Sequence, residues 1–585
     1  MAKTTKSQAR TKRERSEFLW GWLFILPTTI GLIVLNIIPI FQTIYQSFFK
    51  TGDFGKGNIF IGLQNYQKVF ADKEIWQALI NTFKYAIVEV PSSIVIALVL
   101  AVLLNRKMKG RSIYRTIIFL PMVAAPAAVA MVWRWLFNSD YGLINNVFHV
   151  HVNWVSDPKI AVFSVAIIGV WSIIGYNMVL FLSGLQEIPR DYYEAASIDG
   201  ATGVNAFFNI TVPLLSPTIF FVLVTRVIGS LQVFDLIYMV IDKSNPALTK
   251  TQSLVYLFYK YAFINKNMGY GATIVVVLLI ITMILTVFQM IGQKKWVFYN
   301  KKGGLTMDSM ETKKKLTTIL IHVILIIVSI TMLVPFIWMI LTAFKTVTEA
   351  TSVDPFTIFP KIWRKDAFIS VINNMNFLLL YKNTLLLIFF RVVCAVLTAT
   401  MAGYAFGRLN FKGRDLCFSL VLFQMMVPVQ IFIIPQYLMV SKMGMLNTIF
   451  ALVFPGIVTA FGTFLLRQGY MGLPKDLEEA ARLDGCNIGQ TFLYIMAPLT
   501  RSSMVALGIF TAVFAFKDLM WPMIVNTDKD MLVLSSALAK MQGQYVSKFP
   551  ELMAASLIAC IPMIVIYMIF QKQFIEGIAT SGGKL

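Results

Sequence analysis

The stretch EAASIDG at residues 194–200 returns as EAARLDG at residues 479–485. Each copy is followed, at the same intervals, by an isoleucine and a proline (Ile210 and Pro213; Ile495 and Pro498). Both copies lie in polar loops, at 187–213 and 472–498, between strongly apolar segments. A polar loop beside a membrane faces water, so we expect each copy to contact a soluble partner and to act as a coupling element.

The composition indicates an integral membrane protein. Hydrophobic residues make up 57% of the 585 residues and charged residues only 14%, with a mean hydropathy of +0.71, which leaves too little polar surface for a soluble globule. The net charge of +22 does not indicate nucleic-acid binding, because Lys and Arg gather at the ends of apolar segments. The four cysteines lack metal-ligand spacing, and three histidines are too few to build a zinc cluster with them.

Twelve apolar stretches are long enough to cross a membrane, six in each half of the chain. A helix needs about 20 residues to span about 30 Å of hydrocarbon. The stretches lack the alternation of a membrane barrel, so we predict an all-α membrane fold. The stretches lie near 19–48, 79–104, 116–137, 160–183, 213–240 and 270–291, then near 316–342, 379–404, 416–440, 447–467, 498–525 and 550–571.

The chain divides into two halves, which we place at 1–306 and 307–585. A Gly-Gly pair precedes Met307, and the lysine-rich run that follows reads as a second start, as if two proteins had been joined. Six spans in each half give both halves the same direction, so the repeats are parallel. Basic residues concentrate in the N-terminal tail, the loop at 106–115, the joint and the turn at 408–414, which places these segments, both repeated loops and both termini in the cytoplasm.

The repeated loops are predicted to form short helices. Pro189 suits the first turn of a helix and Gly200 ends it with positive φ, and Pro474 and Gly485 frame the second copy alike. One copy alone is equally consistent with a plain cytoplasmic turn, but two copies between spans four and five favour docking. The predicted docking residues are Glu194, Ala195, Ala196, Asp199 and Gly200, with Glu479, Ala480, Ala481, Asp484 and Gly485.

At these loops the chain resembles the permease subunits of ATP-binding-cassette (ABC) importers, whose Glu-Ala-Ala loop docks onto an ATPase subunit. The similarity covers nearly the whole chain and narrows to binding-protein-dependent carbohydrate importers of the maltose and glycerol-phosphate type. It implies the type I permease fold, built from a fused pair of subunits that are usually separate chains. The other motifs are LNRK at 104–107, FLP at 119–121, WRWLF at 133–137, FDLIY at 234–238, YAFGR at 404–408, GMLNT at 444–448, WP at 521–522 and the tail at 574–585.

The resemblance assigns ATP hydrolysis and solute capture to partners. It implies two cytoplasmic ATPase subunits, which use ATP and magnesium, and an extracytoplasmic sugar-binding protein at the inner membrane of a bacterium or archaeon. The sequence agrees, because it contains no GxxxxGK[ST] phosphate-binding loop and its outer loops are too short for a ligand-binding domain. We therefore expect no cofactor and no enzyme activity in this chain.

Polar residues at membrane depth mark the predicted solute pathway, because such groups are costly in lipid. In the family, sugar is held from spans four and five. These residues could equally anchor interfaces or bond neighbouring helices. Arg226 and Arg391 also lie in apolar surroundings, and we expect acidic or carbonyl partners for both. The candidate pathway residues are Tyr176, Asn177, Gln232, Asp235, Tyr238, Lys517, Asp518 and Trp521.

The sequence thus predicts the permease of an ATP-driven sugar importer that works by alternating access. Two other readings stay open. A secondary sugar transporter also often has twelve spans in two parallel halves, but it needs coupling charges in the spans rather than docking loops. A membrane scaffold or receptor with this fold would move no solute. The identity of the sugar does not follow from the sequence.

Overall fold

The computed structural model describes residues 2–52, 58–106, 108–189, 191–198, 203–298, 314–353, 356–544 and 548–579. Three predicted features lie outside this part of the chain: the joint between the halves, the pair Asp199 and Gly200, and the end of the tail at 580–585. The described residues are mostly helical, with one two-stranded hairpin among them.

Eight helices in the described residues are long and apolar enough to cross a membrane. The first, Glu14–Gln46, combines α1 (Ala2–Leu32), η1 (Ile33–Ile37) and α2 (Ile38–Gln46). The fourth, Gly203–Leu231, combines α10 (Gly203–Ala206), η3 (Phe207–Thr211) and α11 (Val212–Leu231). The others belong to α4 (Lys73–Asn105), α8 (Ala161–Glu187), α14 (Met268–Trp296), α15 (Lys314–Ala343), α18 (Phe377–Arg408) and α29 (Phe549–Ala579).

Four further pairs of helices pass the same test only when each pair is counted together, and counting each pair as one span brings the candidate spans in the described residues to twelve, the predicted number. The sequence predicts each as one continuous stretch, but each bends sharply at a short break. The pairs are α5 (Arg111–Val123) with α6 (Pro126–Leu136) at 97°, α19 (Arg414–Met425) with α20 (Gln430–Lys442) at 102°, Ile449–Gly456 with α22 (Ala460–Met471) at 51°, and Ile488–Leu499 with α26 (Arg501–Lys517) at 71°.

Proline explains the two sharpest bends. Pro126 is the first residue of α6, and Pro428 lies in the break before α20. Proline has no N–H to continue the hydrogen-bond ladder, and it disfavours helical geometry in the residue before it. Ala125 accordingly adopts extended backbone, with φ of −62° and ψ of 134°. Hydropathy measures the length of an apolar segment and is insensitive to such a bend.

The two halves interlock through their first spans. Helix α1 of the first half packs on α18 of the second, and α15 of the second half packs on α5 and α6 of the first. A polar contact lies at each crossing: Thr28 of α1 donates to the Thr398 carbonyl of α18 at 3.0 Å, and the Tyr114 hydroxyl of α5 lies 3.1 Å from His322 Nδ1 of α15. Within each half the second span packs on the fourth, as α4 on α8 and α18 on α22.

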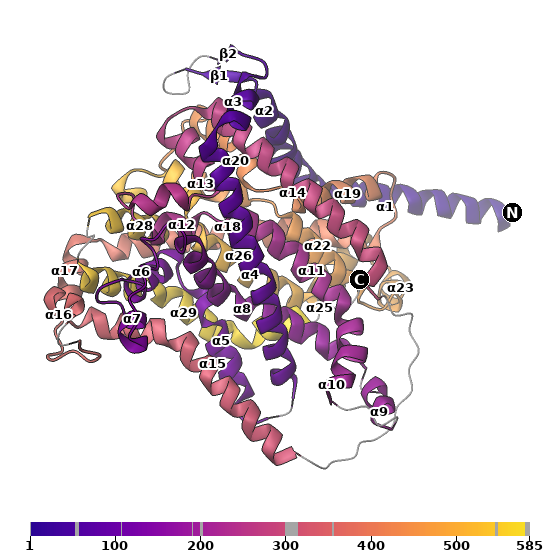
Figure 1. The fold of residues 1–585 in the computed structure, drawn as a ribbon. Coiled ribbons are helices and arrows are strands. Elements are labelled where there is room, and N and C mark those ends of the chain that lie inside the picture. Colours follow the sequence, from indigo (N-terminus) through magenta and orange to yellow (C-terminus); the bar gives the residue numbers. More distant parts are fainter. Residues whose placement is uncertain are drawn as a thin grey trace.

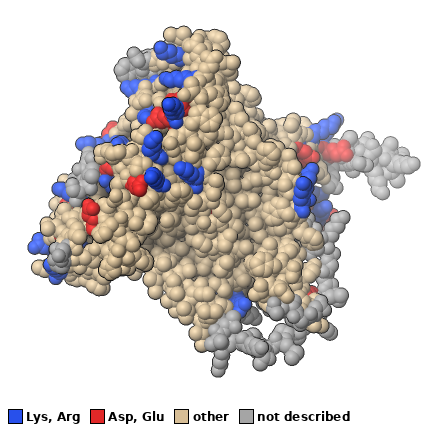
Figure 2. Space-filling model, viewed as in Figure 1, with Lys and Arg blue, Asp and Glu red and all other residues tan. Residues whose placement is uncertain are grey.

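Short elements cover one end of the helix bundle. In Figure 1 those that are labelled lie along the top and the left of the molecule, away from the N-terminus. Figure 2 shows charged side chains over this region and at the opposite edge, with a broad band of other residues between them, as a membrane-embedded belt requires. The elements are β1 (Phe49–Thr51) paired with β2 (Asn58–Phe60), α3 (Gln64–Ala71), α7 (Leu143–Phe148), α12 (Asp235–Val240), α13 (Leu254–Tyr259), α16 (Val347–Thr351), α17 (Asp366–Asn374), α27 (Met520–Val525) and α28 (Leu534–Gln544).

Candidate functional site

Both copies of the repeated stretch form short helices on the side of the molecule away from these elements (Figure 1). They are α9 (Asp191–Ile198) and α23 (Asp476–Leu483), and both carry acidic residues in the first turn, where the helix dipole favours negative charge. On α23, Glu479 and Ala480 are exposed, while Ala481 is buried. On α9, Ala195 is exposed, and Glu194 and Ala196 are half-buried. Each helix therefore presents part of its Glu-Ala-Ala stretch to solvent.

The predicted glycine turn is present at the end of α23. Asp484 caps the helix, and Gly485 follows with φ of +83°, the left-handed region that favours glycine. The N–H of Cys486 then reaches back to the carbonyl of Ala481 at 3.0 Å. The equivalent turn after α9 lies at Asp199 and Gly200, outside the described residues.

A π-helical turn links each short helix to the next span. In the first half η3 precedes Pro213, and in the second η7 (Thr491–Met496) precedes Pro498. Wider turns of this kind occur within helices at functional positions. Because the same turn recurs before the same proline, the repeat extends from the short helix into the start of span five.

The two short helices are anchored by different side chains. Glu478 of α23 pairs with Arg408, the last residue of α18, with 3.0 Å between the Glu478 carboxylate and Arg408 Nε. The residue that corresponds to Glu478 in α9 is Tyr193, and its hydroxyl lies 3.0 Å from the Thr211 hydroxyl in η3. The Arg408–Glu478 pair thus ties the second copy to another span. The Tyr193–Thr211 contact ties the first copy to the π-helical turn that follows α9.

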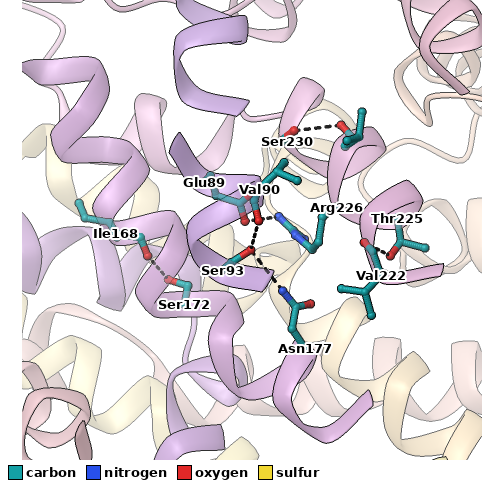
Figure 3. Close-up of polar contacts among 11 residues, drawn as sticks. Glu89, Val90, Ser93, Ile168, Ser172, Asn177, Val222, Thr225, Arg226 and Ser230 are labelled. Atoms are coloured by element: carbon teal, nitrogen blue, oxygen red, sulfur yellow. Dashed lines mark hydrogen bonds and ion pairs between the residues drawn. The ribbon is translucent and has the colours of Figure 1, made fainter. Parts of the chain in front are cut away.

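A second group of polar residues lies among the spans at the centre of the first half (Figure 3). Glu89 of α4 and Arg226 of α11 form an ion pair with 2.5 Å between their oxygen and nitrogen atoms, and the Glu89 side chain is fully buried. One turn along α4, the Ser93 hydroxyl accepts a hydrogen bond from Asn177 of α8 at 3.3 Å. These contacts join spans two, four and five of one half.

The second half also holds an ion pair, but here span two carries the arginine instead of the carboxylate. Arg391 of α18 pairs with Asp518, the residue that follows α26, at 3.1 Å. The same guanidinium donates to the carbonyl of Leu452 at 2.6 Å through Nη2 and at 3.0 Å through Nε. The expectation of acidic or carbonyl partners for Arg226 and Arg391 is therefore confirmed.

A repeated set of hydrogen bonds shows that Glu89 and Arg391 occupy equivalent places. Asn81 and Thr82 near the start of α4 bond the backbone of Gln252 and Leu254 at 3.0 and 3.2 Å. Asn383 and Thr384 of α18 bond the backbone of Leu532 and Leu534 in the same way, both at 3.0 Å. Glu89 and Arg391 follow these Asn-Thr pairs at the same interval. Span two therefore carries opposite charges at one repeat position.

Several predicted pathway residues meet at the junction of the two halves. Tyr176 of α8 packs edge-on against Phe510 of α26, with ring centroids 5.9 Å apart. The Gln232 side chain lies 3.4 Å from the backbone N–H of Val429. Asp235, the first residue of α12, lies within electrostatic range of Lys517 and Asp518.

Other predicted pathway residues are engaged in packing. The Asn177 side chain is buried against α4, and the Trp521 indole donates to the Ala451 carbonyl at 2.8 Å. Tyr238 joins an aromatic cluster with Phe234, Tyr256 and Tyr259 of its own half. These contacts are those of helix-bonding residues, and a place on the solute pathway stays a prediction for each.

Sequence reasoning missed Glu89, Glu478 and Arg408 as interacting residues. A signal exists for Glu89, because a carboxylate in the middle of an apolar span needs a partner. Glu478 and Arg408 carry no comparable signal, since charged residues are ordinary in the loops between spans. Their contact becomes visible only when the chain is folded.

One protein family matches the chain in two separate regions. The family described as binding-protein-dependent transport system inner membrane component matches residues 93–296 and 395–579. A probable ABC transporter permease protein, YesP of Bacillus subtilis, is 35% identical over 300 residues, which cover 50% of this chain and 96% of that protein. The trehalose/maltose transport system permease protein MalF of Thermococcus litoralis is 33% identical over 276 residues, covering 46% of this chain and 93% of the relative.

The chain is also similar to a glycerol-phosphate permease and to a solved transporter structure. The sn-glycerol-3-phosphate transport system permease protein UgpA of Agrobacterium fabrum is 34% identical over 282 residues, covering 48% of this chain and 96% of UgpA. A solved bacterial ABC transporter involved in the import of the acidic polysaccharide alginate aligns with 21% identity and a TM-score of 0.42, over 49% of this chain and 99% of that chain. Each of these proteins corresponds to about half of the present chain.

Proposed function

Because the chain belongs to the family of binding-protein-dependent transport system inner membrane components, we propose that it forms both halves of the permease in one ATP-driven sugar importer. It is a multi-pass inner-membrane transport component and not an enzyme. The observation that carries the proposal is the placement of the repeat: each family-matched region contains one Glu-Ala-Ala helix, α9 in the first and α23 in the second.

The two short helices are the proposed docking points for two cytoplasmic ATPase subunits, which bind ATP and magnesium. ATP binding draws the ATPases together, moves α9 and α23 toward each other and opens the pathway outward; hydrolysis resets it. Nucleotide drives this cycle only if the two states differ in affinity for it, so the separation of α9 and α23 must differ between the states. Both chain termini then lie in the cytoplasm with these helices.

The proposed solute is a sugar or oligosaccharide, delivered by an extracytoplasmic binding protein. The name of the relative from Thermococcus litoralis, a trehalose/maltose permease, supports this class. The junction of the halves offers aromatic and hydrogen-bonding side chains, which are the groups that hold a sugar. Gln232, Asp235 and Tyr176 belong to the first half of this junction, and Lys517 of the second half lies within electrostatic range of Asp235.

In proteoliposomes with the ATPase and the binding protein, we expect sugar uptake that requires ATP and both partners. Changing Gln232 and Asp235 together to alanine removes two polar groups from the junction. Since a hydrogen bond to a charged group contributes about 1.5–3 kcal/mol, solute-stimulated ATP turnover will need roughly tenfold more solute for half-maximal stimulation. Asp366→Ala on the exposed surface of α17 serves as the matched control.

The outcomes separate the remaining readings. Uptake that persists without the ATPase would indicate a secondary transporter, and no uptake with every partner present would indicate a scaffold or receptor. An unchanged solute dependence in the double variant would remove Gln232 and Asp235 from the pathway while leaving the importer intact.

We also expect Gly485→Val to weaken ATPase association. A Cβ at Gly485 would meet nothing within 4 Å, so the effect comes from the backbone: φ of +83° costs a β-branched residue about 1–2 kcal/mol and distorts the end of α23. Co-purification of the ATPase with the chain measures the loss. Gly292→Val in α14 has equally open surroundings without positive φ and should leave co-purification unchanged; equal behaviour of the two variants would count against a docking role for α23.

A further inference from the structure

Arg408 holds the loop that leads into α23 with several hydrogen bonds at once. Besides the Glu478 carboxylate at Nε, it donates to the carbonyls of Leu473 at 3.0 Å, Pro474 at 3.2 Å and Tyr470 at 3.4 Å. The Arg408 side chain is only 5% exposed and that of Glu478 only 9%. A guanidinium presents donors in a fixed planar fork, which suits such a multiple contact, whereas a lysine ammonium is a flexible point charge.

Arg408 also belongs to the helix that reaches the centre of the second half. It ends α18, and Arg391 lies on the same helix, about 25 Å away at about 1.5 Å per residue. Arg391 in turn pairs with Asp518 and bonds the Leu452 carbonyl. Helix α18 is thus fixed by one arginine to the coupling loop and by another to residues near the proposed pathway.

The corresponding contact of the first half has different chemistry. Tyr193 stands where α23 has Glu478, and its hydroxyl meets Thr211 of η3. A neutral hydroxyl pair within one continuous stretch of chain joins α9 to the span that follows it. The Arg408–Glu478 pair instead joins α23 to span two, which lies 70 residues earlier in the sequence.

We propose that Arg408 is a positioning residue that makes α23 and α18 move together, so that the second coupling helix acts on span two as well as on span five. This inference rests on the proposed docking role of α23. A push on α23 reaches α18 through Arg408 and then Asp518 through Arg391.

The test is the ratio of solute transported to ATP hydrolysed, measured in proteoliposomes with both partners. Arg408→Lys keeps the positive charge and loses the planar fork, and Glu478→Gln keeps an acceptor and loses the charge. For each variant we expect the ATPases to remain bound and ATP to be hydrolysed, while transport per ATP falls roughly fivefold or more, the scale of a typical coupling free energy. Arg364→Lys, in the exposed 3.6 Å pair with Asp366, is the matched arginine control and should leave the ratio near that of the unaltered chain.

Each result has a distinct meaning. If hydrolysis and transport fall in proportion together with the thermal stability of Arg408→Lys and Glu478→Gln, the pair is only structural and the inference is overturned. An unchanged ratio in both variants also overturns it. If the unaltered chain shows no ATP-dependent transport, the proposed function itself fails, a result that the variants cannot imitate.

Discussion

Reversing the charge of Glu194 and Glu479 together, to lysine, will release the ATPase subunits and abolish ATP-driven uptake while the chain stays folded. Glu479 is exposed on α23 and Glu194 is half-buried on α9, each beside the exposed alanine of its helix, Ala480 or Ala195, in the proposed docking surface. The loss of an interface anchor costs about 2 kcal/mol or more. Because the two helices are separate sites, the losses add, and affinity should fall roughly a thousandfold for an assembly that needs both.

Co-purification of the ATPases from detergent-solubilised membranes measures this effect directly. Asp366→Lys provides the control, because Asp366 is a carboxylate on α17, at the opposite edge of the molecule in Figure 1. Its ion pair with Arg364 is long, at 3.6 Å, and exposed, so little stability depends on it. ATPases retained in full by the Glu194 and Glu479 double variant would refute docking at α9 and α23.

The helices of the site could be predicted because their signal is local. Proline, paired alanines and glycine within one short stretch define α23 and its turn, and Gly485 adopts the positive φ that this pattern predicts. The long spans follow from apolar length in the same way. The bends in four helix pairs could not be predicted from apolar length. Hydropathy is averaged over a window of residues, in which a single residue such as Pro126 or Pro428 has little weight.

The contacts among the spans could not be predicted because they join residues distant in sequence. The sequence shows that Arg226 needs a partner, but Glu89 is 137 residues away and becomes its partner only through the packing of α11 on α4. Asn177 shows that the sequence alone leaves open what kind of partner a polar residue in a span has. Its place in an apolar span suggests a solute contact, and the fold gives its amide to Ser93. A polar residue in an apolar span indicates that it has a bonding partner, but the sequence does not identify that partner.

Replacing Glu89 with leucine should destabilise the protein more than any other single change considered for the membrane-spanning region. The Glu89 side chain is fully buried and that of Arg226 is 16% exposed, so removal of the carboxylate leaves a cation among apolar helices without its partner. Breaking a buried pair from one side costs about 3–5 kcal/mol. Thermal unfolding in detergent should show a correspondingly lower midpoint for Glu89→Leu.

The double variant Glu89→Leu with Arg226→Leu tests whether the loss comes from the stranded charge. Two leucines of similar bulk leave no ion to solvate, and buried pairs replaced by apolar residues are often close to neutral in stability. The double variant should therefore recover most of the midpoint lost by Glu89→Leu, and the cycle of four proteins gives the interaction free energy of the pair. Additive losses would contradict the pairing. Recovery of stability without recovery of uptake would show that the pair serves the transport cycle as well as the fold.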